Sequence, residues 1–205
     1  MSESEDLLAL IRGRRSVRRF RDEPVDRPTI DRLIEAAAWA PSAGNRQDWI
    51  FTVLTSADAR RRMQEAIHRR VEAVIAESGG AGSLAELARY VGHWSDVTHA
   101  PVLILVSARD TDAIQQRLFG EAAEAAGGGL ASASMAAQTL MLTAHALKLG
   151  TCCMTGPLIA AKELARIAGL PPRQRIVCLM ALGHPAESPP VPPRKPVQAI
   201  SRFIE

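Results

Sequence analysis

The chain has 205 residues, of which 47% are hydrophobic, and its 25 basic and 22 acidic residues leave a net charge of +3. This length fits one domain, because single cores grow to roughly 250 residues before chains split. The hydrophobic content excludes a disordered chain. The longest apolar stretch, residues 130–149, is interrupted by serines, a glutamine and a histidine. It is predicted to be a buried helix and not a membrane span.

The N-terminus and the cysteines indicate a reducing compartment. The first six residues include three acids where a secretory signal would be basic. Cys152 and Cys153 are adjacent, which is poor geometry for a disulfide, and Cys178 is left without a partner. There is no C-x-x-C pair of the kind that holds zinc. We therefore expect reduced, mostly buried thiols in a cytoplasmic protein.

The first half of the chain is predicted to contain three helices and one strand. A short amphipathic helix is expected over residues 4–12, followed by an extended arginine-rich segment. Asp26 is placed to cap the second helix, which Pro41 ends. Residues 49–54 are aromatic and β-branched, which predicts a strand. Apolar spacing over residues 63–75 predicts a long helix.

The middle of the chain is predicted to hold a candidate lid and the core. Residues 79–93 begin with a glycine-rich break and form either a lid or a flexible region. Residues 101–107 are apolar on both faces, which predicts a central strand covered on both sides. Residues 129–148 are predicted to form a helix apolar nearly all round and deep in the core. The glycines at 127–129 favour a flexible helix start over a phosphate loop, since the G-x-G-x-x-G spacing is missing.

The last third is predicted to end in a tail without a core of its own. A strand-like segment over 151–155, a helix over 160–168 and a buried strand over 175–182 precede it. Residues 184–205 are rich in proline, which favours an extended backbone. We therefore expect one α+β domain over residues 1–205, with a central mixed or antiparallel sheet flanked by helices.

Arginines crowd the segment after the first helix. Such a cluster attracts phosphate or nucleic acid, or is simply a solvated surface. Guanidinium donates two parallel hydrogen bonds and a nearby hydroxyl adds a third, which suits a phosphate. Arg14 and Ser16 make this combination, and together with residues 40–49 and 194–195 they suggest a protein that holds a phosphorylated flavin. The cluster comprises Arg12, Arg14, Arg15, Arg18, Arg19, Arg21, Arg27 and Arg32.

Five motifs in this order resemble the nitroreductase-like family of FMN-dependent NAD(P)H oxidoreductases, over roughly residues 7–200. The resemblance is weakest over 79–125. Two positions depart from the family pattern: Asp48 stands where proline is usual, and Lys148 where glycine is common. The motifs are Arg14, Ser16, Arg18 and Phe20; Ala40, Pro41, Ser42, Asn45, Gln47 and Trp49; Leu149 and Gly150; Leu182, Gly183 and Pro185; and Arg194 with Lys195.

The resemblance implies a homodimer with two FMN sites at the subunit interface and the tail reaching the partner subunit. It implies that NADH or NADPH reduces the flavin, and that a nitroaromatic, quinone or similar acceptor is then reduced in the same place. The flavin would carry out the hydride transfer, and the protein would position it and supply the surrounding charges.

The resemblance also assigns cofactor-binding residues. Arg14, Ser16 and Arg194 or Lys195 would hold the phosphate, with Arg15 contributing mainly its backbone. Arg18 would face the N1–C2 carbonyl edge, where reduction deposits negative charge. The partner chain would supply the segment containing Pro41, Ser42, Ala43, Asn45 and Gln47. Backbone groups of Met154, Thr155 and Gly156 would lie near the flavin N5–O4 edge.

Two other functions compete with this one. A protein of the same fold could carry out flavin fragmentation or reductive dehalogenation, because those activities depend on lid residues. A nucleic-acid-binding module would also use the arginine cluster. Aromatic residues make up only 4% of the chain, which leaves few stacking platforms for bases. We therefore expect no nucleic-acid partner, and no membrane or metal partner either.

Overall fold

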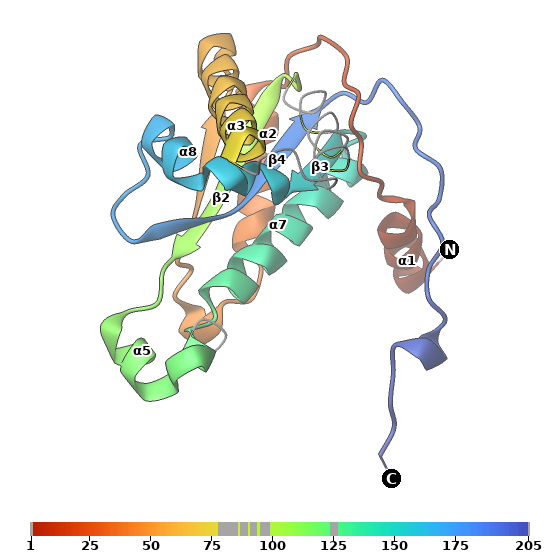
Figure 1. Cartoon of the computed structure of the whole chain (residues 1–205). Helices are drawn as coiled ribbons and strands as arrows, with labels where there is room; N and C mark the ends of the chain where they lie inside the picture. The colour runs from red at the N-terminus through yellow and green to blue at the C-terminus, as the bar shows by residue number, and fades with distance from the viewer. Residues whose placement is uncertain are drawn as a thin grey trace.

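The computed structural model describes residues 2–77, 99–123 and 127–204, together with Glu86, Tyr90 and Trp94. Most of the predicted lid, residues 79–93, lies outside the described residues. Figure 1 shows a sheet packed between helices, with a long C-terminal segment running away from it. No helix in the described part of the chain is long and apolar enough to span a membrane.

The sheet is antiparallel throughout and has the strand order β1-β2-β4-β3. Its strands are β1 (Trp49–Leu54), β2 (Val102–Arg109), β3 (Gly150–Met154) and β4 (Gln174–Gly183). The two central strands are buried on both faces, as their continuous apolar sequences predict. The α+β class with an antiparallel sheet is thus confirmed.

Six α-helices surround the sheet in the described residues. Side-chain caps begin several of them: the Ser2 hydroxyl accepts from the amide of Glu5, the Asp26 carboxylate from that of Thr29, and the Asp112 carboxylate from that of Gln115. The short α5 was not predicted. The helices are α1 (Glu3–Gly13), α2 (Arg27–Ala38), α3 (Ala57–Glu77), α5 (Ala113–Phe119), α7 (Gly129–Ala146) and α8 (Ala161–Ile167). Short 3-10 turns are η1 (Ala43–Asn45), η2 (Gly120–Ala122), η3 (Gly156–Ala160) and η4 (Val197–Ala199).

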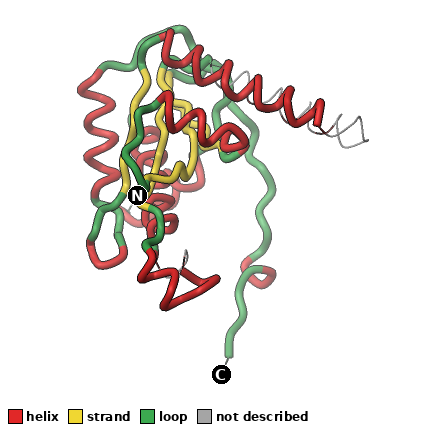
Figure 2. The backbone as a smooth tube through the Cα atoms, turned by 60° about the vertical axis from the view of Figure 1, so that its left-hand side comes forward, coloured by secondary structure: helices red, strands yellow, loops and turns green. Residues whose placement is uncertain are grey.

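The helices form one layer on each face of the sheet. Side chains of β2 alternate between the two layers: Ile104 and Val106 pack with α2 and α7, whereas Leu103 and Leu105 pack with α3 and α8. Figures 1 and 2 show the same arrangement from two sides. This rigid centre fixes both ends of β3, where the candidate site lies.

The structure corrects one expectation about α7. Residues 129–148 were predicted to be deep in the core, but only one side of the helix is buried. Ala133, Ala137 and Leu140 pack on the sheet, whereas Leu130 and Met135 are each 41% exposed. Both faces of the helix are apolar, because small residues fill the inward face and larger apolar residues lie on the outer one. The sequence therefore resembles that of a fully buried helix. An exposed apolar face of this kind is typical of an interaction surface.

The C-terminal tail contacts the body only at its beginning. Residues 184–189 alternate in exposure beside the arginine-rich segment, and residues 190–204 are all exposed. Figures 1 and 2 show this tail extended away from the sheet. The prolines predicted the extended backbone correctly.

Candidate functional site

The arginine-rich segment is held against the sheet by backbone hydrogen bonds. Ser16 forms a parallel bridge with Thr151 of β3, and the amide of Val17 donates to the Thr151 carbonyl at 2.9 Å. Phe20 then forms an antiparallel bridge with Pro185, just beyond β4. The segment therefore spans from one end of β3 to the start of the tail, and its side chains have a fixed backbone behind them.

Glu187 of the tail fastens this segment further. Its carboxylate oxygen Oε1 accepts from the backbone amides of Arg18 and Arg19, at 2.6 and 3.1 Å. Hydrogen bonds from ionised groups to amides are stronger than neutral ones. The sequence gave no sign of Glu187, because it lies 168 residues from Arg19 in a proline-rich tail. It holds the backbone from which the Arg18 side chain projects.

A cavity of about 410 Å³ opens beside this segment. Arg14 and Arg15 line it after α1, and His145 and Lys148 line it at the end of α7. Thr151 of β3 and Glu187 of the tail also belong to its lining. The Arg15 guanidinium donates to the Arg14 carbonyl at 2.7 Å. The cavity therefore gathers more positive than negative groups at the position where the sequence predicted a phosphate.

The second predicted segment, after α2, forms a strained turn. Gly44, Asn45 and Gln47 have φ angles of 60°, 52° and 51°. For asparagine and glutamine this left-handed region is costly, and such conformations cluster at functional sites. The Ser42 hydroxyl accepts from the Gln47 amide at 3.1 Å, and the Gln47 side chain donates to Asn45 Oδ1 at 3.1 Å. These bonds hold the turn in one shape.

The turn is tied to the start of α7. The Ser132 hydroxyl accepts from the Ala43 amide at 3.2 Å and donates to the Gly128 carbonyl at 2.5 Å. Gly128 has a φ of 68°, and an added Cβ there would lie 2.6 Å from the Ala43 side chain. Glycine is thus required by close approach as well as by φ. The glycines before α7 are a helix start, as predicted.

Asp48, which replaces the usual proline, braces the same turn. Its carboxylate accepts from Arg46 Nε at 2.9 Å, and Arg46 also reaches the Gly127 carbonyl. The Asp48 carbonyl accepts from the Arg109 amide at 3.1 Å and the Gln174 side chain at 3.3 Å. Asp48 therefore ties the turn to β2 and β4.

The third predicted segment follows β3 and lies under an aromatic side chain. Met154 ends β3, Thr155 is exposed, and Gly156 begins η3. An added Cβ on Gly156 would lie 1.8 Å from the ring of Trp94, whose other neighbour is Tyr90 at a ring separation of 4.4 Å. The glycine lets a buried aromatic ring close over the backbone.

The thiols differ from expectation at one position. Cys152 and Cys178 are buried and Cys153 is exposed, so burial was wrong for Cys153. It sits at the edge strand opposite Met180, on the side of the sheet that Cys178 shares. A hydrogen bond from the Cys178 thiol lowers the pKa of Cys153, and the charge of Arg14 lowers it further. The same hydrogen bond, followed by burial, raises the pKa of Cys178.

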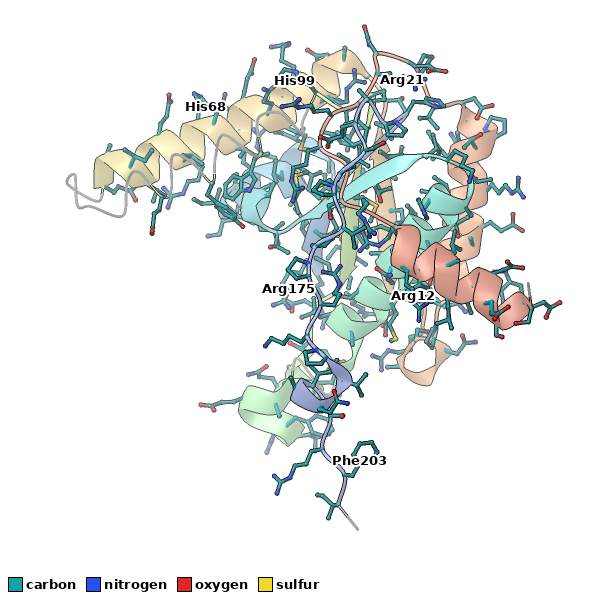
Figure 3. All side chains as sticks on the ribbon, turned by 90° about the vertical axis from the view of Figure 1, so that its right-hand side faces the viewer. Arg12, Arg21, His68, His99, Arg175 and Phe203 are labelled. Atoms are coloured by element: carbon teal, nitrogen blue, oxygen red, sulfur yellow. The ribbon has the colours of Figure 1, made fainter. Side chains whose placement is uncertain are left out.

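The remaining predicted residues lie on the tail. Arg194 and Lys195 are exposed, and Arg194 donates to the neighbouring carbonyl of Pro193 at 3.3 Å. Figure 3 shows the tail continuing past this point to Phe203, well clear of the sheet. The structure thus brings Arg14 and Arg15 to one cavity with Ser16 bonded alongside through its backbone, while the roles of the tail cations stay predictions.

The sheet, the helical layers and this cavity define an α+β protein with a basic cavity at the edge of its sheet. Residues 11–184 match the Nitroreductase family, and the chain belongs to that family. The recognition made from the five motifs is thereby confirmed.

Several relatives share this fold or sequence. An NADH dehydrogenase of Thermus thermophilus is 32% identical over 176 residues, which cover 85% of this chain and 84% of that protein. An iodotyrosine dehalogenase 1 homolog of Caenorhabditis elegans is 30% identical over 200 residues, which cover 93% of this chain and 58% of that relative's length. The crystal structure of a BluB-like flavoprotein from Clostridium difficile 630 superposes with a TM-score of 0.84 at 26% identity, covering 100% of both chains.

Proposed function

We propose that the protein is an FMN-dependent NAD(P)H oxidoreductase. The observation that carries the proposal is the cavity lined by Arg14 and Arg15 and fixed against β3, in a chain of the Nitroreductase family. FMN, when bound, supplies hydride transfer from NADH or NADPH and then to a second substrate. The relative named NADH dehydrogenase supports this class of reaction. We also propose a cytoplasmic location, which the three free cysteines support.

The described residues fit the phosphate end of FMN. Arg14 projects from a segment whose backbone is bonded to β3, so little backbone freedom remains to be lost on binding. A guanidinium donates two parallel bonds to a phosphate, and the Ser16 hydroxyl lies next along the same segment. Arg194 or Lys195 would add a second cation from the tail.

Other residues would orient the ring system. Arg18, held by Glu187 through its backbone, would place a cation at the flavin edge that becomes negative on reduction. Backbone groups from Met154 to Gly156 would meet the opposite edge. The braced turn from Pro41 to Gln47 would come from the partner subunit and exclude water.

We also propose a homodimer. Apolar side chains are exposed on α1, α5, α7 and the tail, where Phe203 is 85% exposed, and just after α2, where Trp39 is 86% exposed. Exposed apolar surface on this scale is typical of an interaction site. The tail, which packs on nothing in its own chain beyond residue 189, has a natural place on a second copy.

A second candidate is reductive dehalogenation of an aromatic substrate by the same site. The relative named iodotyrosine dehalogenase 1 homolog favours it, as do further relatives named iodotyrosine deiodinase. Both candidates use FMN and differ in the acceptor.

The test is a flavin titration followed by acceptor assays. The purified protein should carry or take up FMN and show its blue-end absorption band. Arg14→Ala should weaken FMN by about 1.5–3 kcal/mol, because it removes a charge-assisted contact. A quinone, a nitroaromatic and a halogenated phenol, each supplied with NAD(P)H, then separate the two candidates. Loss of the flavin itself during turnover would indicate flavin fragmentation, and a colourless protein that binds DNA would overturn both.

A further inference from the structure

The cavity beside the arginine-rich segment contains one cation, Lys148, that the family pattern does not assign. Arg14 and Arg15 enter it from the end of α1, and Lys148 and His145 enter it from the end of α7. Its carboxylate, Glu187, is engaged by two backbone amides through Oε1. The balance of charge in this cavity is therefore positive.

Lys148 occupies an unusual backbone position. Its φ is 63°, in the left-handed region that glycine adopts without cost and that a lysine adopts only with strain. Glycine is common here in the family pattern, so this chain departs from it at a local cost. The backbone bonds of the turn are satisfied, with the amide of Lys148 donating to the His145 carbonyl at 3.0 Å. The turn itself therefore gives no reason for a charged side chain.

The pKa of His145 depends on the charges in the cavity. Burial lowers its pKa first, and the charges of Lys148, Arg14 and Arg15 lower it further. The ring also fills the space beside Gly13, where an added Cβ would lie 2.8 Å from Nε2. The groups that face it are Arg14 and Arg15 after α1, Lys148 after α7 and Glu187 from the tail, with Arg12 in the last turn of α1.

We propose that Lys148 binds a phosphate monoester in this cavity together with Arg14 and Arg15. The monoester is the phosphate of FMN or that of a nicotinamide nucleotide, and the choice between these sources rests on the proposed function. A lysine is a point charge for phosphate, whereas the two arginines supply planar pairs of donors. Binding of the anion would also stabilise the protonated form of His145, because it cancels the charges that lower its pKa.

The variants are chosen to separate charge from folding. Lys148→Gln removes the charge and keeps the backbone requirement, whereas Lys148→Gly removes the charge and relieves the φ of 63°. Lys148→Gly therefore cannot fail through backbone strain. Lys162→Gln is the matched control, because Lys162 is also exposed but lies on α8, on the other face of the sheet.

The first measurement compares ligands with and without the phosphate. Protein freed of flavin is titrated with FMN and with riboflavin, followed by flavin fluorescence. Lys148→Gln and Lys148→Gly should each weaken FMN about threefold to tenfold and leave riboflavin unchanged. Lys162→Gln should change neither. If FMN binding is unaffected but the apparent affinity for NADPH falls relative to NADH, the phosphate comes from the nucleotide. If neither pair responds, the proposal is overturned.

The second measurement does not need a flavin. Inorganic phosphate is added at rising concentration while the pKa of His145 is followed by NMR. The pKa should rise with phosphate in the natural protein and rise less in Lys148→Gln, by reciprocal linkage. A pKa that ignores phosphate would overturn the proposal even if FMN binds. Failure of the natural protein to bind FMN would instead overturn the proposed function and leave this titration to decide the role of Lys148.

Discussion

Arg18 is the side chain whose proposed role is electronic and not structural. Its backbone is fixed by Glu187, and its exposed guanidinium donates one hydrogen bond, to the Ser16 carbonyl at 3.4 Å, which leaves its other N–H groups to meet a flavin edge. A fixed cation that contributes about 1.4 kcal/mol more to the reduced state raises a two-electron potential by about 30 mV. Arg18→Ala should therefore lower the FMN potential by up to about that amount, while oxidised FMN still binds.

Arg19→Ala is the control for this measurement. Arg19 is the exposed neighbour in the same segment, and its amide meets the same carboxylate. Potentiometry on both variants should show a shift for Arg18→Ala alone. Equal shifts would mean that only the total charge of the segment matters, and no shift would remove Arg18 from the flavin edge.

Cys153 should be the reactive thiol of the folded protein. It is the exposed cysteine, and its pKa is lowered by the Cys178 thiol, so more of it is thiolate at neutral pH. Cys178→Ala removes that donor, which should move the midpoint of the pH–alkylation profile upward and slow alkylation near pH 7 more than at high pH. Stopped-flow alkylation measures both effects. Cys153→Ser should abolish the fast phase, and a fast phase that survives it would assign the reactivity elsewhere.

The sequence could suggest individual site residues only where the side-chain chemistry suits a ligand and the motifs follow one another in the family's order. Arg14 and Ser16 were predicted because a guanidinium and a hydroxyl suit a phosphate. Glu187 was missed because its partners are distant in sequence and no local pattern marks it. Lys148 stood out in the sequence only as a departure from the family pattern, because its place in one cavity with Arg14 follows from the packing of α1 on α7.

The elements were predictable in proportion to their length and burial. β2 and β4 are continuous apolar segments, which suffices to identify central strands. Asp26 marked the start of α2 by a local hydrogen bond. α5 spans only seven residues and none of them is buried, so it has no periodic signal to detect. The outer face of α7 was misjudged because sequence does not tell which subunit covers an apolar surface.

A single mutation should weaken the contact between the Ser42–Gln47 turn and α7, because one hydroxyl, that of Ser132, bridges them. Ser132→Ala leaves the Ala43 amide without its acceptor, since the hydroxyl that bridges it to the Gly128 carbonyl is lost. The expected cost is about 1–2 kcal/mol of unfolding free energy, measured by urea denaturation of the flavin-free protein.

Ser134→Ala is the matched control, because Ser134 lies on the same helix, two residues after Ser132, and its hydroxyl bonds within the helix. Its exposed hydroxyl donates to the Leu130 carbonyl at 2.8 Å, within the helix. Its loss should change the unfolding free energy by less than about 0.5 kcal/mol. If Ser132→Ala costs no more than Ser134→Ala, the turn is held by the other bonds around Ser42 and Asp48.

At the scale of the whole molecule, the exposed apolar surface and the tail require the same explanation. The side chains concerned belong to elements far apart in sequence and include Leu130 and Met135 on α7 and Phe203 on the tail. A stable dimer commonly buries upwards of roughly 2,000 Å², which would cover several such patches at once. In the dimer that we propose, each subunit would lay its tail on the other.

Truncation after Pro189 tests this arrangement without disturbing the cavity. Residues 184–189 stay, so Glu187 keeps its bonds to Arg18 and Arg19. Removing residues 190–205 should shift the protein from dimer to monomer at low micromolar concentration. Light scattering should then give once the mass of the truncated chain, whereas the full chain gives twice its 22.1 kDa. FMN affinity should fall with it, because the partner's turn and the tail cations leave the site together. The full-length double variant Arg194→Ala/Lys195→Ala separates these causes: it should weaken FMN and remain dimeric. A truncated monomer that binds FMN as tightly as the full chain would contradict a site shared between subunits.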